Sequence, residues 1–263
     1  MRRECELKYR INNKTKDKLV QKLVANDFQC VKSNTETDFI LDTEDRLCRD
    51  AGILFRIRIE SSKEENQKSR IIITIKKKRN VLIVQNNDGN IAFQENNKFQ
   101  DNTEIEFEVN SSKSNDITIG VEILKKATGC FVPEDDLRNG SVEILIKKLS
   151  QLGFSHIEIL QKKRIYYKKN QVVVTIDHFP YIVGDFIEIE TYNENDLYET
   201  VELLDLKSDE LEHRSYGELI LENTNGRCFF SDKIIYDEIQ RKWIGVHEII
   251  DELIKERKSN INC

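Results

Sequence analysis

Glu4-Cys5-Glu6-Leu7-Lys8 stands almost at the start of the chain and decides how the rest of the sequence is interpreted. Side chains alternate between the two faces of an extended strand, so Glu4, Glu6 and Lys8 share one face while Cys5 and Leu7 share the other. A strand on the protein surface would expose its charges to water and bury its apolar face. Later segments repeat the alternation with charges of both signs, which favours a barrel with a charged interior.

Seven later segments are predicted to be strands, at residues 35–42, 54–60, 70–78, 104–109, 156–168, 171–177 and 186–190. Their inward-facing acidic residues, together with those of the first strand, are Glu4, Glu6, Glu106, Glu108, Asp177, Glu188 and Glu190. The inward-facing basic residues are Lys8, Arg56, Arg58, Lys76, Lys162 and Arg164. Glu104, near a strand end, is expected to face solvent.

This mixture of enclosed charges predicts both a metal ion and a chain of phosphates. Carboxylates enclosed together need cations, because burying an unpaired charge is costly. Hard divalent ions such as Mg²⁺ or Mn²⁺ prefer oxygen ligands, and they commonly bind through one or two carboxylates plus substrate phosphates. Arginine forks and lysine point charges suit phosphate oxygens. A triphosphate that also ligates the metal would neutralise both sets of charges.

Apolar residues at helical spacing predict helices around the strands, at 14–28, 121–127, 141–152, 197–206, 210–222 and 234–254. Residues 61–69 are expected to form a hairpin loop and residues 85–102, rich in Asn and Gln, a longer connection. The segment 110–140 is expected to be a covering segment or insertion. We therefore expect one domain over 1–226, with insertions near 85–102 and 110–140, and a helical extension over 227–263.

Amino-acid composition and the absence of certain motifs argue against several classes of protein. Charged residues make up 33% of the chain but the net charge is only −6, which does not indicate a wholesale nucleic-acid-binding surface. The six cysteines form no Cys-x-x-Cys pair, and the sequence contains no secretory or membrane-spanning run, so a reducing cytoplasm is expected. The four histidines lack metal-ligand spacing. Neither a Gly-x-x-x-x-Gly-Lys loop nor a Gly-x-Gly-x-x-Gly fingerprint is present, which disfavours the common nucleotide-binding folds.

Several motifs, in the correct order, resemble the CYTH superfamily of triphosphate tunnel metalloenzymes. The first strand resembles its Glu-x-Glu-x-Lys signature, and the resemblance extends over about residues 1–221. The residues that match the family's later motifs are Asp38-Phe39, Gly52 with Arg56 and Arg58, Thr74 with Lys76, Lys162 with Arg164, and Asp177 followed by Gly184, Phe186, Glu188 and Glu190. Ser215-Tyr216 resembles the Ser-Tyr helix of the class IV adenylate cyclase branch.

The resemblance implies an α+β fold, a closed eight-stranded antiparallel β-barrel surrounded by helices. It also implies that Glu4, Glu6, Glu188 and Glu190, with Asp177 as a further candidate, bind Mg²⁺ or Mn²⁺, and that the six inward basic residues bind the triphosphate. Lys8, Lys76 and Arg164 are the candidate catalytic residues among these six, and Glu106, Glu108 and Tyr216 are additional candidates, although packing is the favoured role of Tyr216. Which residue acts as the base is left open.

Family members cyclise ATP or hydrolyse inorganic triphosphate, thiamine triphosphate or RNA 5′ ends. The first expectation is a class IV adenylate cyclase that converts ATP to cyclic AMP and pyrophosphate. The alternatives are an inorganic or thiamine triphosphatase, or a binding module that recognises nucleotides, polyphosphate or triphosphorylated RNA without turnover. The expected partner is a small-molecule triphosphate, with RNA disfavoured, no membrane, and a homodimer left open. The segments 85–102 and 110–140, which compact members lack, could reshape the mouth of the tunnel.

Overall fold

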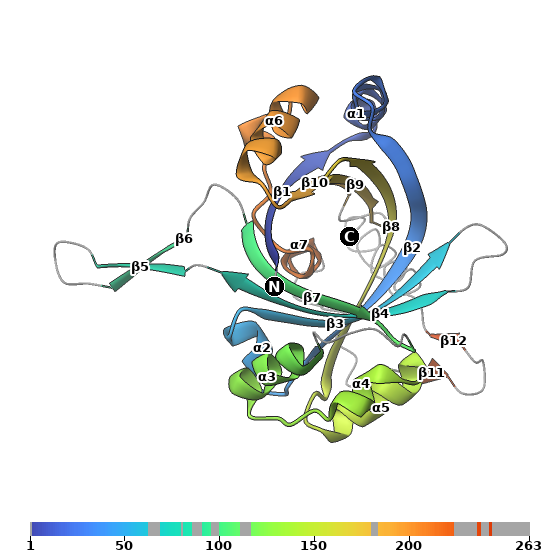
Figure 1. The fold of residues 1–263 in the computed structure, drawn as a ribbon, viewed down its shortest axis with the longest axis vertical. Coiled ribbons are helices and arrows are strands. Elements are labelled where there is room, and N and C mark those ends of the chain that lie inside the picture. The colour runs from blue at the N-terminus through green and yellow to red at the C-terminus, as the bar shows by residue number, and fades with distance from the viewer. Residues whose placement is uncertain are drawn as a thin grey trace, which may run out of the picture.

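The computed structural model describes residues 2–62, 69–79, 81–85, 91–95, 100–110, 117–179, 184–223, 236–237 and 242–243. Within these ranges, antiparallel strands and short helices confirm the predicted α+β class (Figure 1). None of the helices in the described part of the chain has the length and hydropathy needed to cross a bilayer.

Eight strands form a closed antiparallel barrel (Figure 1). Their order around the barrel is β1 (Arg2–Ile11), β10 (Asp185–Thr191), β9 (Val172–His178), β8 (His156–Lys169), β2 (Gln29–Asp42), β3 (Ile53–Ser62), β4 (Arg70–Arg79) and β7 (Gln100–Glu108). The first strand closes it, because Cys5 lies opposite Thr191 of β10 on one side and opposite Asp101 of β7 on the other. Each strand therefore has an inner face and an outer face.

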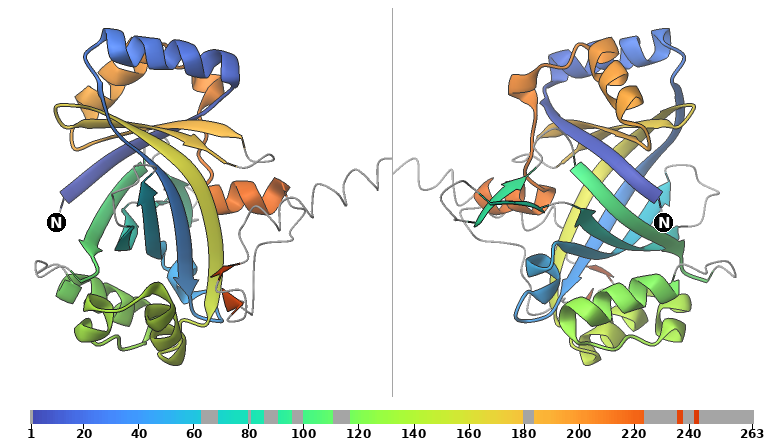
Figure 2. Two further views of the ribbon diagram at one scale, coloured as in Figure 1. Left: turned by 90° about the vertical axis from the view of Figure 1, so that its right-hand side faces the viewer. Right: turned by 60° about the vertical axis from the view of Figure 1, so that its left-hand side comes forward.

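Helices cover the outer faces on two opposite sides of the barrel (Figure 2). On one side, Phe39, Phe55 and Ile73 join a core formed with α3 (Ile117–Thr128), α4 (Glu134–Arg138) and α5 (Val142–Gln151). On the other side, Leu7 and Ile187 join a second core formed with α1 (Asn13–Ala25) and α6 (Glu194–Leu204). Since burial of apolar surface drives folding, these two cores fix the outer faces of the strands and leave the charged faces inside.

Local sequence signals set several element ends. Asn12 caps α1, because its side chain accepts hydrogen bonds from the backbone of Lys14 and Thr15 while Thr15 bonds back to Asn12. Gly52, with a φ of +66°, permits the turn between α2 (Leu47–Asp50) and β3. The turn at Gly52 places α2 between the end of β2 and the start of β3.

Two predicted connections contain regular structure. The Asn-rich segment 85–102 was expected to be a connection, but β5 (Val81–Gln85) and β6 (Ile91–Glu95) pair as a hairpin beside the barrel, and β7 begins at Gln100 (Figure 1). Two short apolar segments can pair with each other as strands, and the composition of the segment alone does not reveal that pairing. The segment 110–140 supplies α3 and α4, which cover the outer face as expected.

The predicted C-terminal helices differ from those observed. Instead of one helix over 210–222, the chain forms a 3-10 turn (Ser208–Glu210), an extended stretch and then α7 (Tyr216–Asn223). The stretch is extended because the backbone N–H of Glu212 donates a hydrogen bond of 2.8 Å to the backbone carbonyl of Lys8. The helix predicted over 234–254 is also wrong where the chain is described, since β11 (Tyr236–Asp237) pairs with β12 (Lys242–Trp243). Aromatic residues favour such pairing. The remainder of that prediction lies outside the described residues.

Candidate active site

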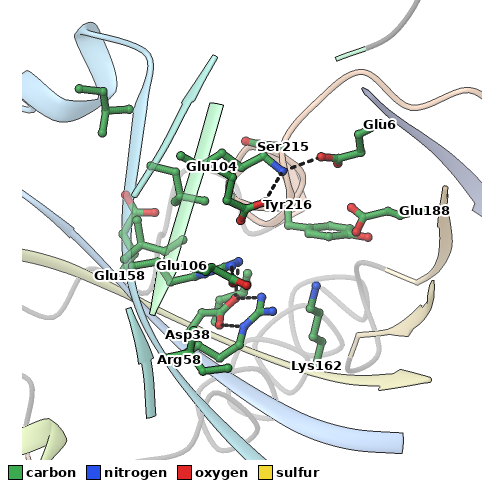
Figure 3. Close-up of a pocket in the computed structure, with 18 of the residues that line it drawn as sticks. Glu6, Asp38, Arg58, Glu104, Glu106, Glu158, Lys162, Glu188, Ser215 and Tyr216 are labelled. Atoms are coloured by element: carbon green, nitrogen blue, oxygen red, sulfur yellow. Dashed lines mark hydrogen bonds and ion pairs between the residues drawn. The ribbon is translucent and has the colours of Figure 1, made fainter. Parts of the chain in front are cut away.

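The barrel encloses a cavity of about 1010 Å³ lined by the inner faces of its strands (Figure 3). The charged lining residues predicted from the sequence are Glu6, Lys8, Arg56, Arg58, Lys76, Glu106, Lys162, Arg164, Glu188 and Glu190. Ser215 and Tyr216, at the start of α7, also line it. Residues far apart in the sequence, from Glu6 to Tyr216, therefore meet around one cavity, and those on the strands lie on the faces that the alternation predicted.

Asp38 holds the two arginines of β3. The guanidinium of Arg58 donates from Nε to Oδ1 at 2.6 Å and from Nη2 to Oδ2 at 2.9 Å, and Arg56 Nη1 lies 3.5 Å from Oδ2. Burial alone would raise the pKa of Asp38, but Arg58 and Arg56 hold it well below its usual range. Asp38 is thus ionised and orients both cations into the cavity.

Asp177 holds the two basic residues of β8 in the same way. Arg164 donates to Oδ1 and Oδ2 at 2.5 Å each, and Lys162 Nζ donates to Oδ2 at 2.9 Å. The hydroxyl of Tyr216 also donates to Oδ2, at 2.7 Å. Asp177 is fully buried and is not among the cavity-lining residues, so its oxygens face protein donors. This geometry favours a positioning role for Asp177 over metal ligation.

A third buried carboxylate, Glu36, was missing from the predicted set. Its side chain is fully buried, lies 3.0 Å from Nη1 of Arg58 and accepts a hydrogen bond from the hydroxyl of Tyr166. Lys162 and Arg164 lie within 4 Å of it, at 3.8 and 3.9 Å. The available signal was its spacing two residues before Asp38, which puts both on the inner face of β2.

Glu6, Glu188 and Glu190 form an acidic group on the neighbouring strands β1 and β10. Glu6 lies opposite Glu190 in the strand register, and Lys8 lies opposite Glu188. Glu6 accepts a hydrogen bond of 2.8 Å from Lys76, and Glu188 accepts one from Arg164. Burial would raise the pKa of Glu6, but Lys76, Lys8 and Arg164 lower it to about 2.

Glu190 has the opposite electrostatic character. Burial, together with the nearby charges of Glu6 and Glu188, raises the pKa of Glu190 to about 7 despite Arg164 and Lys76. Three carboxyl groups from the neighbouring strands β1 and β10 thus lie together at the cavity, which fits a site for a divalent cation with oxygen ligands. Among the described side chains, no three His, Cys, Asp or Glu residues form a ready metal cage, so phosphate oxygens or water would have to complete the coordination.

Lys8 and Tyr216 form a contact that the sequence did not predict. The Lys8 ammonium lies 4.4 Å from the centre of the Tyr216 ring and donates a hydrogen bond to the carbonyl of Arg214. Burial lowers the pKa of Lys8 despite the opposing charges of Glu188 and Glu6. The Tyr216 ring packs against Phe179 and Phe186, with centroids 4.4 and 5.3 Å away, and Tyr216 also lines the cavity.

The other acidic residues considered in the sequence differ in their position relative to the cavity. Glu106 lies in the cavity and accepts a hydrogen bond from Thr74, whereas Glu108 is not a lining residue and pairs with Arg70 at 2.8 Å. Glu104 was expected to face solvent, but it lines the cavity 3.8 Å from Lys76 (Figure 3). That expectation was wrong because β7 begins at Gln100, which puts Glu104 within the strand, on the same face as Glu106 and opposite Lys76 of β4. The side chain of Glu4 lies outside the described part of the structure.

Comparison with known proteins agrees with this architecture. A model of the CYTH domain family matches residues 2–216. A conserved hypothetical protein from Pyrococcus furiosus is 21% identical with a TM-score of 0.50, and the match covers 82% of this chain and 99% of that chain. A candidate adenylate cyclase from Vibrio parahaemolyticus is 15% identical with a TM-score of 0.50, covering 83% and 97%. At these identities the likeness shows the fold alone. No curated protein sequence matches the chain.

Proposed function

The chain belongs to the CYTH family, and from this premise we propose that it is a metal-dependent enzyme that acts on a triphosphate. The observation that carries the proposal is one cavity lined both by the six basic residues predicted from the sequence and by Glu6, Glu188 and Glu190, within a lining that also holds other acidic and basic residues. The basic residues are Lys8, Arg56, Arg58, Lys76, Lys162 and Arg164. Such a charge distribution suits a polyanion that brings a cation with it.

The buried carboxylates support this role for the basic residues. Asp38 and Asp177 fix the guanidinium groups of Arg58 and Arg164 by paired hydrogen bonds, so these arginines are oriented before a substrate arrives. Preorganised donors stabilise charge that develops on phosphate oxygens without a further cost of reorganisation. Lys8 on β1 and Lys76 on β4, the strand next to β3, supply further point charges. We therefore assign phosphate binding to these residues and positioning to the two aspartates.

Glu6, Glu188 and Glu190 are assigned to a divalent cation, Mg²⁺ or Mn²⁺, with Glu4 retained as a candidate from the sequence. When bound, such an ion would neutralise phosphate charge and polarise the phosphorus being attacked. The placement of these three carboxyl groups on the neighbouring strands β1 and β10 supports the assignment, because oxygen ligands that lie together suit a hard divalent cation. Glu106, which also faces the cavity, is retained as an additional candidate.

The first candidate reaction is conversion of ATP to cyclic AMP and pyrophosphate. The ribose 3′ oxygen would form a bond to the α-phosphorus, the bond between that phosphorus and the bridging oxygen to the β-phosphate would break, and pyrophosphate would leave while the 3′ hydroxyl loses its proton. Ser215-Tyr216 at the cavity supports this candidate through its resemblance to the class IV cyclase motif. Hydrolysis is the second candidate. In that reaction the six basic residues would bind the phosphates in the same way, and water would attack in place of the ribose 3′ oxygen.

Product analysis tests the proposal. The protein is incubated with ATP, tripolyphosphate or thiamine triphosphate and Mg²⁺ or Mn²⁺, and cyclic AMP, pyrophosphate and phosphate are measured. Cyclic AMP with pyrophosphate supports cyclisation, whereas phosphate release without cyclic nucleotide supports hydrolysis. Glu190→Gln should abolish either activity, whereas Glu143→Gln, on the exposed face of α5, should not change it. Tight binding with no turnover of any compound would show a binding module and contradict the enzymatic proposal.

A further inference from the structure

The chain between α6 and α7 crosses the first strand of the barrel. Figure 2 shows it leaving α6 and running past the barrel to α7. Leu211 pairs with Tyr9 as an antiparallel bridge, and the backbone N–H of Glu212 donates a hydrogen bond of 2.8 Å to the carbonyl of Lys8. We call residues 211–215 the strap.

The strap lies along the edge of β1 beyond its pairing with β7. β7 begins at Gln100, which lies opposite Glu6. The other edge of β1 is taken by β10, whose Ile187 lies opposite Tyr9. The strap therefore continues the wall of the barrel past the start of β7 and meets β1 at Lys8, one of the basic residues that line the cavity.

The strap also contacts the side chain of Lys8. The Lys8 ammonium donates a hydrogen bond to the carbonyl of Arg214 and lies 4.4 Å from the centre of the ring of Tyr216, the residue that follows the strap. A lysine side chain is long and flexible, so its charged end needs a fixed partner to hold one position. The backbone at Arg214 supplies that partner.

The carboxylate of Glu212 fixes the backbone at Arg214. It accepts hydrogen bonds from the backbone N–H of Arg214 at 3.1 Å, from Nε at 2.7 Å and from Nη2 at 2.6 Å. Arg10 Nη2 lies 3.6 Å from the same carboxylate. The hydrogen bonds from Arg214 lower the pKa of Glu212 to about 2, so the carboxylate is ionised at neutral pH.

Glu212 acts from outside the cavity. It is only 7% exposed, and neither Glu212 nor Arg214 is among the described residues that line the cavity. A paired contact between guanidinium and carboxylate fixes geometry as well as contributing energy. The side chains of Glu212 and Arg214 thus lock the two-residue segment that carries the carbonyl bonded to Lys8.

We propose that Glu212 is a positioning residue for Lys8, because it holds the Arg214 carbonyl that directs the Lys8 ammonium within the phosphate site. The inference rests on the proposed function, since it assumes that Lys8 binds a phosphate oxygen. An ammonium has three donors, so it can bond a phosphate and the Arg214 carbonyl together. The strap thereby helps to determine how tightly the phosphates are bound.

A double-mutant cycle tests the inference, because it separates action through Lys8 from a general structural effect. Binding of tripolyphosphate is measured by titration calorimetry in EDTA for the wild type, Glu212→Gln, Lys8→Met and the double variant. Glu212→Gln keeps the size of the side chain but removes its charge and one of its two acceptor oxygens.

We expect Glu212→Gln to weaken binding about fivefold or more when Lys8 is present and less than about twofold in the Lys8→Met background. Equal weakening in both backgrounds, or no weakening in either, would overturn the inference and leave the triphosphate proposal standing. If Lys8→Met alone bound tripolyphosphate as tightly as the wild type, the assignment of Lys8 to phosphate would fail, and this inference with it.

Arg214→Met tests the same contact from its other side and covers the case in which Glu212→Gln fails to fold. The Arg214 side chain is 46% exposed, and the substitution removes the guanidinium while keeping the backbone carbonyl. We expect the same dependence on Lys8, and unchanged binding would overturn the inference. The matched control is Asp209→Asn, an exposed acidic residue in the 3-10 turn before the strap, which should match the parent protein in both backgrounds.

Discussion

Arg164 and Asp177 share two hydrogen bonds of 2.5 Å deep inside the barrel, between neighbouring strands β8 and β9. Removing the negative partner would leave buried Lys162 with only the more distant Glu36, at 3.8 Å, and buried Arg164 with Glu36 and Glu188. We expect Asp177→Asn to lower the free energy of unfolding by about 3 to 5 kcal/mol, as is typical when one partner of a buried ion pair is lost. Chemical denaturation measures this change.

The control for that prediction is Asp136→Asn, which removes a pair with Lys148 whose side chains are 28% and 40% exposed. Such a pair contributes at most about 1 kcal/mol. Tripolyphosphate should restore part of the stability of Asp177→Asn, since its oxygens can pair with the stranded cations. Equal effects of the two substitutions would show that Asp177 is not essential to the charge balance of the barrel.

Glu190 predicts an unusual dependence of stability on pH in the metal-free protein. Its pKa is raised to about 7, so the folded state favours the protonated form, and stability from this group is lost as the pH rises from about 4.5 through 7. Glu190→Gln should therefore stabilise the protein by up to about 3 kcal/mol at pH 8 and have little effect at pH 4.5. Urea denaturation in EDTA at the two pH values measures it. A constant difference between variant and wild type at both values would contradict the raised pKa.

Arg58 should not tolerate replacement by lysine. Its guanidinium contacts Asp38 through two nitrogens and Glu36 through the third, at 3.0 Å, a geometry that a lysine ammonium cannot reproduce. We expect Arg58→Lys to lower kcat/KM for the triphosphate about tenfold or more, because charged hydrogen bonds contribute about 1.5 to 3 kcal/mol each. Arg138→Lys, on α4 and outside the cavity lining, is the control and should retain wild-type activity.

Loss of the Glu6 carboxylate should weaken binding of the metal ion without weakening binding of the phosphates. Lys76 donates a hydrogen bond of 2.8 Å to Glu6, so Glu6→Gln removes a proposed metal ligand and also releases Lys76 from its counter-ion. Electron paramagnetic resonance should show Mn²⁺ binding weakened about tenfold or more, in line with the loss of a carboxylate ligand. In EDTA, binding of tripolyphosphate should be unchanged or tighter. Weaker tripolyphosphate binding without metal would argue against this assignment.

Much of the fold and of the site follows from alternation along the strands. The period of two correctly assigned Glu6 and Lys8, Arg56 and Arg58, and Glu188 and Glu190 to inner faces, because the outer faces had to be apolar to meet the helices. Alternation identifies a face but not a neighbour across strands. The sequence therefore could not distinguish a carboxylate that faces the cavity, such as Glu190, from one enclosed by arginine and lysine, such as Asp177.

Features that depend on closure of the barrel or on pairing between distant segments also could not be predicted from the sequence. Glu104 faces the cavity because β7 begins at Gln100 and pairs Glu104 with Lys76 of β4, and the stretch before α7 is extended because its Leu211 pairs with Tyr9 of β1. Glu36 differs from these, since its position two residues before Asp38 by itself predicts that both side chains lie on the inner face of β2. Alternation along the strands was thus reliable, whereas the helical pattern over 234–254 was not, and contacts between distant segments required the structure.

Pairing of Cys5 with both Asp101 and Thr191 has a consequence for the order of assembly. During synthesis the first strand emerges early, yet one of its partners is some 95 residues away and the other almost twice as far along the chain. Such distant contacts slow folding, because a large loop must close before they are gained. The ribosome must release most of the polypeptide before the acidic and basic walls can meet, so the catalytic chamber is expected to form last.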